Sequence, residues 1–512
     1  MSRPGPGGDV AGSEDPVGIQ LAAGEFGAIC DEMGAVLVRS AHSANIKERR
    51  DCSTAVFDRE ARLVMQAEHI PVHLGSMPAS VEAVAQLDQR PGNTWFLNDP
   101  FRGGSHLPDI TVVTPFFDPS GELLGFAANR AHHADVGGVL PGSMPADSVS
   151  LEEEGVIIAP RLMDGESIEE VIARMRQPEQ RRADLRAQLA ANRIGVSRME
   201  GLAASRGAGE VLKMIERVIG YAERRTRACL ARIPDGDYSS RDVLEGRFGR
   251  IELALEVRVR GETVIFDFGE GPDPDPGNLN CPRAVTESAC YFAVRVITDA
   301  DIPASAGTFA PVEVRTREGS LLDARSPAAV VAGNVETSSR VADLCLAAFG
   351  MALGQGTMNN LTLGNADFTY YETIGGGQGA FPEVDGPSAT HVAMSNTLNT
   401  PIEALEVEFP LLAREYSVRR DSGGEGLHHG GDGIVRDLEA LSPMSFSLLT
   451  ERRGEGPPGA AGGASGRPGL NLLIRRDSEE PRELPPKVEG GLESGDRIRV
   501  ETPGGGGYGK GP

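Results

Sequence analysis

Histidines gather in the N-terminal part of the chain, with carboxylates close to them in the sequence. Imidazole nitrogens and carboxylate oxygens are common protein ligands of Zn, Mn and Fe. Both are available near neutral pH, because imidazole is then largely neutral and Asp is ionised. These residue types therefore favour a divalent metal site. Six of the nine histidines belong to this group: His42, His69, His73, His106, His132 and His133.

Two apolar segments close to these histidines predict the element that would bring them together. Residues 110–117 are rich in β-branched and aromatic side chains, and residues 123–129 form a second apolar run. Between them lies Asp-Pro-Ser-Gly at 118–121, which is a turn signal. We therefore expect a β-hairpin whose open end carries histidines on both strands.

The register of this hairpin decides which side chains meet. If Phe117 pairs near Glu122, His106 lies opposite His133, to within two residues along either strand. Residues that face each other in an antiparallel pair share one face of the sheet and lie close together. The residues predicted to meet at the open end are His106, Asp109, His132, His133 and Asp135.

Several assignments follow from this cluster. His106, Asp109 and one or both of His132 and His133 are the candidate metal ligands, and the register does not choose between the last two. Asp51 lies just before a predicted strand and could complete the set, whereas its neighbour Cys52 is a weaker candidate. An imidazole that does not bind metal could transfer a proton. The alternative is a hydrogen-bonded cluster without metal. The candidate catalytic residues are His132, His133 and Asp135.

Hydrophobic periodicity places the hairpin in a mixed α+β, multi-domain chain. A β-hairpin and helix domain carries the metal site, a helical segment follows, and the C-terminal part is β-rich with Gly-rich loops. Helical spacing runs from Val17 to Val38, and alternation with period 2 begins after Pro234. The predicted divisions are a flexible tail at 1–15, a metal-site domain with the helical segment at 16–235, an α/β middle domain at 236–358 and a β-rich domain at 359–512.

The helical segment is rich in Arg and Glu and extends from Ser167 to about Ile233. Ser167 and Glu170 have capping-box spacing, and Pro178 can occupy the first position of a new helix. The segment either covers a sheet or offers a face to a partner subunit, and the two roles are compatible.

Composition excludes several classes of partner. The 512 residues carry 74 acidic and 50 basic side chains, a formal charge of −24, which argues against nucleic acid or an anionic membrane as the main partner. The sequence contains no apolar run of about 18 residues, and its first residues lack the apolar core of a signal peptide. We therefore expect a cytoplasmic location. The 65 glycines predict many tight turns and chain crossings.

Two glycine-rich segments bear on nucleotide binding. Residues 504–510 have the spacing of a phosphate-binding loop, but no helix can follow and Gly511 replaces Ser or Thr. No dinucleotide-binding fingerprint is present either, so we do not expect this chain to bind a nucleotide. The second segment, 375–379, either presents backbone N–H groups to an anion or is a tight chain crossing.

Several long motifs run through the chain: NIKERRDCSTAVFD (45–58), HIPVHLGSMP (69–78), NDPFRGGSHLPDITVVTPFF (98–117), NRAHHADVGG (129–138), AGNVETSSRVAD (332–343), MSNTLNTPIEALEVEFP (394–410), RRDSGGEGLHHGGDG (419–433) and TPGGGGYG (502–509). These motifs resemble those of the hydantoinase B/oxoprolinase family, which includes the B-type component of N-methylhydantoinase, the C-terminal part of 5-oxoprolinase and the α subunit of acetone carboxylase. The resemblance extends from about residue 17 to 509.

The resemblance implies a heteromeric enzyme. An ATPase subunit of the A type takes up ATP and Mg and phosphorylates the substrate, and the B-type subunit, which this chain resembles, completes the reaction at a metal site. It implies a small-molecule cyclic amide as substrate, and a ketone carboxylase or a non-catalytic scaffold subunit as alternatives. The family's metal residues correspond to His106, Asp109 and His132, with Asp51 and His133 less firmly placed. One departure is Ala393, where a family His is expected.

Overall fold

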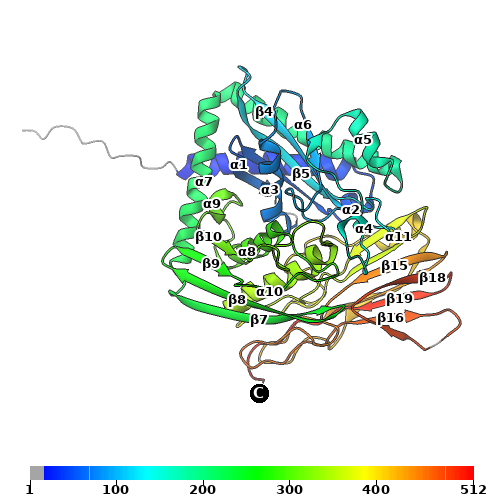
Figure 1. The fold of residues 1–512 in the computed structure, drawn as a ribbon. Helices are drawn as coiled ribbons and strands as arrows, with labels where there is room; N and C mark the ends of the chain where they lie inside the picture. The colour runs from blue at the N-terminus through cyan, green and yellow to red at the C-terminus, as the bar shows by residue number, and fades with distance from the viewer. Residues whose placement is uncertain (1–15, 68–69, 479, 512) are drawn as a thin grey trace, which may run out of the picture.

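The computed structural model describes residues 16–67, 70–478 and 480–511. The predicted tail at 1–15 and His69 lie outside these residues. The described chain forms four sheets and a set of helices that pack on the first two of them (Figure 1), which confirms the mixed α+β fold. The predicted division into domains stays a prediction. None of the helices in the described ranges is long and apolar enough to cross a bilayer.

The first sheet carries the predicted hairpin. Its strand order is β2-β1-β5-β4-β3-β6, and its paired strands run antiparallel. Every residue of β1 and β4 is buried, because helices cover both faces of the sheet. The strands are β1 (Cys52–Asp58), β2 (Leu63–Ala67), β3 (Trp95–Leu97), β4 (Asp109–Phe117), β5 (Leu123–His132) and β6 (Arg161–Leu162).

Apolar contacts place different helices on the two faces of this sheet. Leu74 and Met77 of helix α3 pack on the face that carries Phe57, whereas Phe26 and Met33 of α1 pack on the other. Two long helices complete the second layer (Figure 1). The helices are α1 (Pro16–Ser40), α2 (Ala44–Lys47), α3 (His73–Ala85), α6 (Pro178–Arg206) and α7 (Ala208–Leu230).

The helical segment agrees with the sequence in all but one detail. Pro178 begins α6 as predicted, and α6 covers the sheet, where Asn192 Nδ2 donates to Val112 O at 3.0 Å. The predicted cap at Ser167 is wrong. Helix α5 (Gly165–Ile172) begins earlier, because the Asp164 carboxylate accepts the Ser167 N–H at 2.7 Å and takes the capping position.

A second sheet, in the order β10-β9-β8-β7, packs one face on helices α8 and α10. Its other face is open, so β8 alternates between buried and exposed side chains as the period-2 pattern predicts. A one-turn π-helix, η1 (Gly333–Thr337), leads directly into α10. The remaining elements are β7 (Gly236–Gly246), β8 (Gly249–Arg260), β9 (Thr263–Asp267), β10 (Val312–Arg315), α4 (Leu151–Glu154), α8 (Arg283–Ile297), α9 (Ala306–Phe309) and α10 (Ser338–Ala348).

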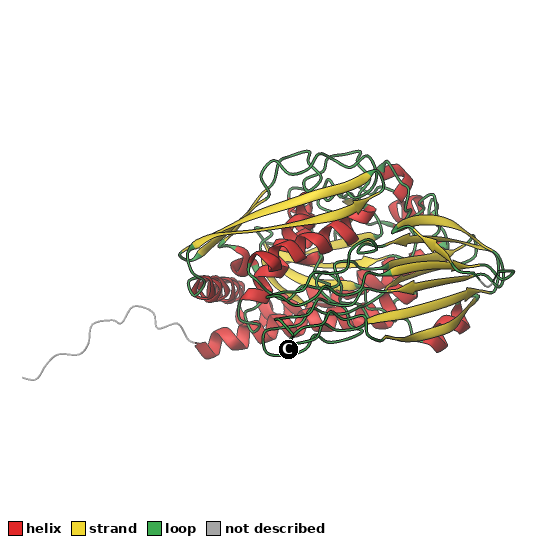
Figure 2. Cartoon of the chain, turned by 90° about the horizontal axis from the view of Figure 1, so that it is seen from below, coloured by secondary structure: helices red, strands yellow, loops and turns green. Residues whose placement is uncertain are grey.

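The C-terminal part is a β-sandwich. A sheet in the order β12-β11-β15-β18 packs on one in the order β13-β14-β19-β16-β17, and Leu361 and Leu448 of the first share a core with Leu438 and Ile498 of the second (Figure 2). Its elements are β11 (Asn360–Gly364), β12 (Thr369–Thr373), α11 (Ile402–Glu408), β13 (Leu411–Arg419), β14 (Gly433–Ala440), β15 (Met444–Leu449), β16 (Leu470–Ile474), β17 (Arg482–Leu484), β18 (Lys487–Leu492) and β19 (Arg497–Glu501).

Beside the sandwich, four glycine-rich segments cross one another without side chains between them; we call 375–379, 423–431, 459–466 and 504–507 the glycine crossing. Gly505 N–H donates to Gly431 O at 2.8 Å, and Gly431 N–H donates to Gln378 O at 2.8 Å. A Cβ on Gly505 would overlap Gln378 O. The N–H groups of 376–379 donate to the protein's own carbonyls, so this loop is a tight crossing rather than an anion site.

Candidate metal centre

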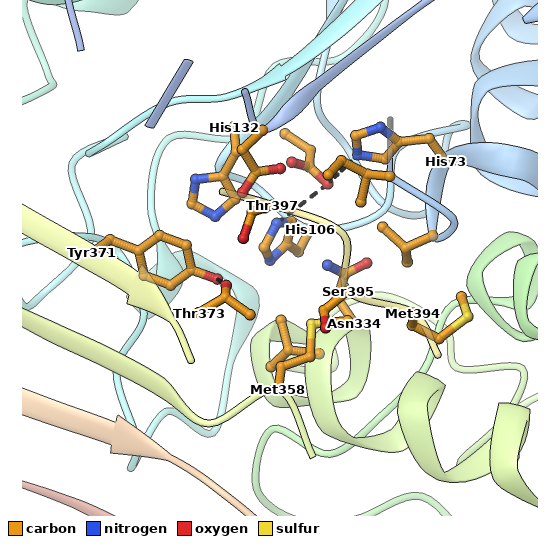
Figure 3. A pocket seen from close by; sticks show the side chains of 15 residues that line it. His73, His106, His132, Asn334, Met358, Tyr371, Thr373, Met394, Ser395 and Thr397 are labelled. Carbon is orange, nitrogen blue, oxygen red and sulfur yellow. Dashed lines mark hydrogen bonds and ion pairs between the residues drawn. The ribbon is translucent and has the colours of Figure 1, made fainter. Parts of the chain in front are cut away.

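A small cavity lies where the first sheet, η1 and β12 meet (Figure 3). Its volume is about 30 Å³. A buried water needs roughly 10–15 Å³ of such volume, so the cavity has room for an ion and its water. Polar side chains from distant parts of the sequence line it: Asp51, His73, His106, Asp109, His132, Asn334, Tyr371, Thr373, Ser395 and Thr397.

Three of these side chains form a compact ligand set. Asp109 begins β4 and pairs directly with His132 at the end of β5, while His106 lies in the loop before β4. Each of the three offers one ligand atom, and these atoms all lie within 4.8 Å of one another. His106 Nε2 is 3.3 Å from Asp109 Oδ2. All three side chains are buried, so a metal bound there would be withdrawn from bulk solvent.

The ligand set leaves hydrogen-bonding capacity unused. Asp109 Oδ1, both ring nitrogens of His106 and His132 Nε2 are buried without a hydrogen-bond partner among the described residues. Each unsatisfied buried polar atom costs about 1–3 kcal/mol. Such atoms are rare in folded proteins, and here they converge on one cavity. Two imidazoles and a carboxylate with free lone pairs fit a divalent transition metal.

The protonation states also suit a metal. Burial raises the pKa of Asp109, but His106 and His73 outweigh this effect and hold its pKa well below the usual range, so the carboxylate is ionised. Burial lowers the pKa of His132 well below its ordinary value, so the imidazole is neutral. Metal binding requires these two states.

A second layer of side chains orients the ligands. Ser105 Oγ donates to Asp109 Oδ2 at 2.7 Å, and the Asn45 carboxamide nitrogen lies 3.1 Å from His132 Nδ1. Turning the Asn45 amide end for end lets its oxygen accept from Nδ1–H of His132. The Nε2 lone pair then faces the cavity, as a ligating histidine requires.

The buried guanidinium groups of Arg49 and Arg130 balance the negative charges of Asp51 and Asp109. Arg49 Nη2 is 3.6 Å from Asp51 Oδ2, and burial raises the pKa of Asp51 against the opposing effect of this cation. Burial lowers the pKa of Arg130 to about 10, so Arg130 stays charged at neutral pH. Its donors go to hydroxyl and carbonyl groups, including Thr111 Oγ1 at 2.8 Å. The centre is therefore close to neutral before a metal adds its two positive charges.

The structure places the other two predicted site residues outside the cavity lining. His133 follows His132 along the chain and turns to α6, where its Nε2 meets Gln188 Oε1 at 2.9 Å. Asp135 accepts N–H bonds from Gly137 and Gly142 at 2.7 and 2.8 Å and pairs with Arg176. Both side chains are engaged in holding the chain beyond β5.

Cys52 is buried beside Asp51, and burial raises the pKa of its thiol to about 12. A protonated thiol is a poor metal ligand, so Cys52 remains a weak candidate.

Among the lining residues that sequence reasoning did not assign, His73 and Asn334 carry a buried side-chain atom without a hydrogen-bond partner. His73 begins α3, and its Nε2, 3.6 Å from Asp109 Oδ2, has no hydrogen-bond partner among the described residues, while Nδ1 meets Ser53 Oγ at 2.8 Å. Asn334 lies on η1, with a carboxamide that points toward His106 (Figure 3). The sequence contained a hint of His73, because it belongs to the N-terminal group of histidines. Nothing in the local spacing of residues pointed to Asn334.

His132 is also held by aromatic stacking. The Tyr371 ring of β12 lies parallel to the His132 ring, with centroids 4.6 Å apart, and Arg49 lies over the Tyr371 ring at 4.6 Å. The C-terminal sandwich therefore supplies one wall of a centre whose ligands come from the first sheet and the loop that leads into β4.

Comparison with known proteins gives one consistent result. The sequence profile described as "Hydantoinase B/oxoprolinase" matches residues 15–511. "5-oxoprolinase 1" of Arabidopsis thaliana is 39% identical over 97% of this chain and 42% of its own length. A putative D-/L-hydantoinase component of the B type, from a Pseudomonas species, is 26% identical over 97% of this chain and 90% of its own length. The chain thus spans about two fifths of the 5-oxoprolinases that it matches.

Two solved structures share the fold. The ATP-dependent caprolactamase from Pseudomonas jessenii superposes with a TM-score of 0.90 at 27% identity, covering 98% of this chain and 92% of that one. Nucleotide-free acetone carboxylase gives a TM-score of 0.87 at 16% identity, covering 97% of this chain and 76% of that one. The second likeness is one of fold alone.

Proposed function

The chain belongs to the hydantoinase B/oxoprolinase family, and from this membership and the geometry of the metal centre we propose that it is a B-type component of an ATP-dependent enzyme that hydrolyses cyclic amides. The observation that carries the proposal is the convergence of unpartnered ligand atoms of His106, Asp109 and His132 on one buried cavity.

The proposed ligands are His106, Asp109 and His132, with Asp51 at the rim of the cavity as a fourth donor. Zn, Mn and Fe all accept this donor set. Such a metal, when bound, supplies Lewis-acid chemistry that activates water and polarises an oxygen of the substrate. The buried position of the ligands excludes bulk water from that chemistry.

His73 is the proposed proton carrier, in place of His133. Its Nδ1 is held by Ser53, and its unpartnered Nε2 faces Asp109 at the cavity. Burial lowers the pKa of His73, so its Nε2 is free to accept a proton near neutral pH. The Asp109 carboxylate beside it would stabilise the charge that it then carries.

The substrate has to pass the side chains that line the cavity before it reaches the ligands. Met358 and Met394 line the cavity. Because unbranched methionine side chains change rotamer at low cost, we expect these two side chains to move when the substrate binds.

Phosphorylation of the substrate is proposed to occur elsewhere. An amide resists attack by water, and phosphorylating its oxygen converts that oxygen into a leaving group. Residues 504–507, which have the spacing of a phosphate-binding loop, pack against the backbone of the other segments of the glycine crossing. They therefore leave no room for a phosphate, and we assign ATP and Mg to an A-type ATPase component. Since the chain covers 90% of the hydantoinase component and only 42% of the oxoprolinase, that ATPase would be a partner subunit in a hetero-oligomer, or another part of a longer protein. A cytoplasmic location stays a prediction.

Co-expression with an A-type ATPase subunit tests the proposal. We expect a stable complex by size exclusion with light scattering, and ATP-dependent release of a ring-opened product from a cyclic amide such as 5-oxoproline or a hydantoin. ATP turnover that requires bicarbonate and a ketone would instead establish the carboxylase alternative. A chain that hydrolyses a cyclic amide without ATP or a partner would overturn the division of labour.

A further inference from the structure

One wall of the metal cavity is a single layer of chain. Ser395 and Thr397 line the cavity and are each 6% exposed, whereas Asn396 and Leu398, which alternate with them, are exposed to solvent (Figure 3). This segment therefore has the cavity on one side and solvent on the other. Other lining side chains belong to strands such as β5 and β12, which lie deep in the fold.

Few hydrogen bonds hold this wall to the rest of the protein; we call residues 391–397 the flap. Among the described residues, the backbone of 391–395 makes one backbone hydrogen bond, from Ser395 N–H to Val392 O at 3.2 Å, and both of its ends lie in the flap. His391 Nδ1 meets Ser395 Oγ at 3.2 Å, again inside the flap. A segment with so few bonds to its surroundings opens at a low free-energy cost.

Firm attachments begin on both sides of the flap. Before it, Thr390 exchanges two backbone hydrogen bonds of 2.9 Å with the first segment of the glycine crossing. After it, Leu398 N–H donates to Arg49 O at 2.9 Å. The buried Glu372 carboxylate then accepts the Thr400 N–H at 3.2 Å. The two ends of the flap are thus fixed, so an opening movement is confined to the residues between them.

Apolar packing and one unfavourable backbone conformation act on the flap in opposite directions. Met394 is fully buried and belongs to the core beneath the second sheet. Ala393, next to it, has a φ of +50°, in the left-handed region that residues other than glycine adopt at a cost in free energy. The burial of Met394 is therefore the main interaction that keeps the flap closed.

We propose that the flap is the gate of the metal cavity. It moves outward between its fixed ends at Thr390 and Leu398, Met394 leaves the core, and the wall that opens admits metal and substrate. This inference goes beyond the proposed function, because the ligands are buried whichever small molecule reacts. Closing the flap returns Ser395 and Thr397 to the cavity wall and shields the centre from bulk water.

The first test compares two methionines that line the same cavity. Met394→Ala removes the side chain that keeps the flap closed. Met358→Ala, the matched control, removes the same side chain from a segment outside the flap, where Met358 N–H donates to Glu336 Oε1 at 3.1 Å. The measurement is the rate at which the metal-loaded full chain loses its metal to a chelator.

We expect Met394→Ala to lose its metal at least roughly tenfold faster than the wild type, because the closed flap forfeits the burial of this side chain. Met358→Ala should stay close to the wild type, because it widens the cavity without releasing the flap. Equal acceleration in both variants, or none in Met394→Ala, would show that the flap is not the gate.

A cross-link tests the gate in the opposite direction. A Cβ on Gly354 would lie 3.3 Å from Val392 Cβ, just below the roughly 3.5–4.5 Å of a disulfide. Replacing Val392 by Cys also removes the methyl group that crowds this position. The double variant Gly354→Cys, Val392→Cys, once oxidised, should lose metal at least roughly tenfold more slowly than its reduced form. The two single variants are the controls and should not respond to oxidation. A disulfide confirmed by mass spectrometry that leaves the rate unchanged overturns the proposal.

Hydrogen–deuterium exchange needs neither a variant nor a metal, so it decides the question if a variant fails to fold. The amides of 391–395 should exchange much faster than those of β12 in the wild type. Protection of the flap as strong as that of β12 would contradict the proposal. A chain that binds no metal would overturn the metal centre and the proposed function, whereas this exchange measurement would still test the gate.

Discussion

Removing one metal ligand should abolish both metal binding and the stability that the metal confers. His106→Ala deletes one of three donors whose ligand atoms lie within 4.8 Å of one another, and the remaining His132 and Asp109 supply only two donors of this triad. The three side chains are almost fully buried, which gives replacement ligands little access. We therefore expect stoichiometric metal in the wild type after reconstitution and almost none in the variant.

The size of the thermal effect follows from linkage. A metal present at 1,000 times its dissociation constant stabilises the folded state by about 4.1 kcal/mol. Unfolding entropy is about 2.1 cal/mol/K per residue, so 512 residues unfolding as one unit give roughly 1.1 kcal/mol/K. The ratio of the two predicts that chelation lowers Tm of the wild type by roughly 4 °C. His106→Ala should show no shift.

The assay combines elemental analysis with thermal unfolding in the presence and absence of a chelator. His429→Ala is the control, because His429 is an exposed histidine in a glycine-rich loop far along the chain, and it should behave as the wild type. The reasoning from unpartnered ligand atoms would be refuted by two results together. The wild type would hold no metal after exposure to Zn, Mn and Fe, and its Tm would be the same with and without the chelator.

Three further outcomes are expected. Burial raises the pKa of Glu154 from 4.5 to about 8, so between these pH values the folded chain keeps a proton that the unfolded chain releases. The free energy of unfolding should therefore fall as the pH rises from 5 to 8. Urea unfolding at the two pH values measures this fall, and the Glu154→Gln variant should not show it. Calorimetry with Mg·ATP should detect no micromolar binding to the chain alone, and such binding would contradict the assignment of ATP to another component. Gly505→Ala should destabilise the fold strongly, because its Cβ overlaps Gln378 O, whereas Gly201→Ala, in an open helical position, should stabilise it by about 0.5–1 kcal/mol in chemical unfolding.

The hairpin shows how far local sequence could predict the site. Its strands and turn were recognisable, but pairing Phe117 near Glu122 differs from the observed register, in which Phe117 pairs with Leu123 and Asp109 with His132. One residue of this shift arises at the turn, where Phe117 pairs with Leu123, and the other arises from a bulge between Phe116 and Phe117, which sequence spacing alone does not reveal. Because side chains alternate along a strand, a shift of two residues leaves His132 on the same face as Asp109, whereas His133 turns to α6.

The rest of the site depends on contacts between distant segments. Tyr371 stacks on His132 from a strand more than two hundred residues later, and Asn334 enters from a π-helical turn. Periodicity predicts which face of an element is buried but not which other element covers it. The helical segment shows the same limit, because the cap at Asp164 depends on one side chain's orientation rather than on motif spacing.

The glycine crossing has a consequence for the order of events during biosynthesis. The ribosome releases residues 106–132 long before residues 504–507, yet β12, which forms a wall of the cavity, runs straight into the first crossing segment at 375–379. That segment is locked only when the last glycines pack on it. The segments that carry the ligands therefore leave the ribosome before the wall formed by β12 can be locked in place. We expect the ion to load in this interval, and the finished apoprotein to take it up far more slowly than a refolding chain does.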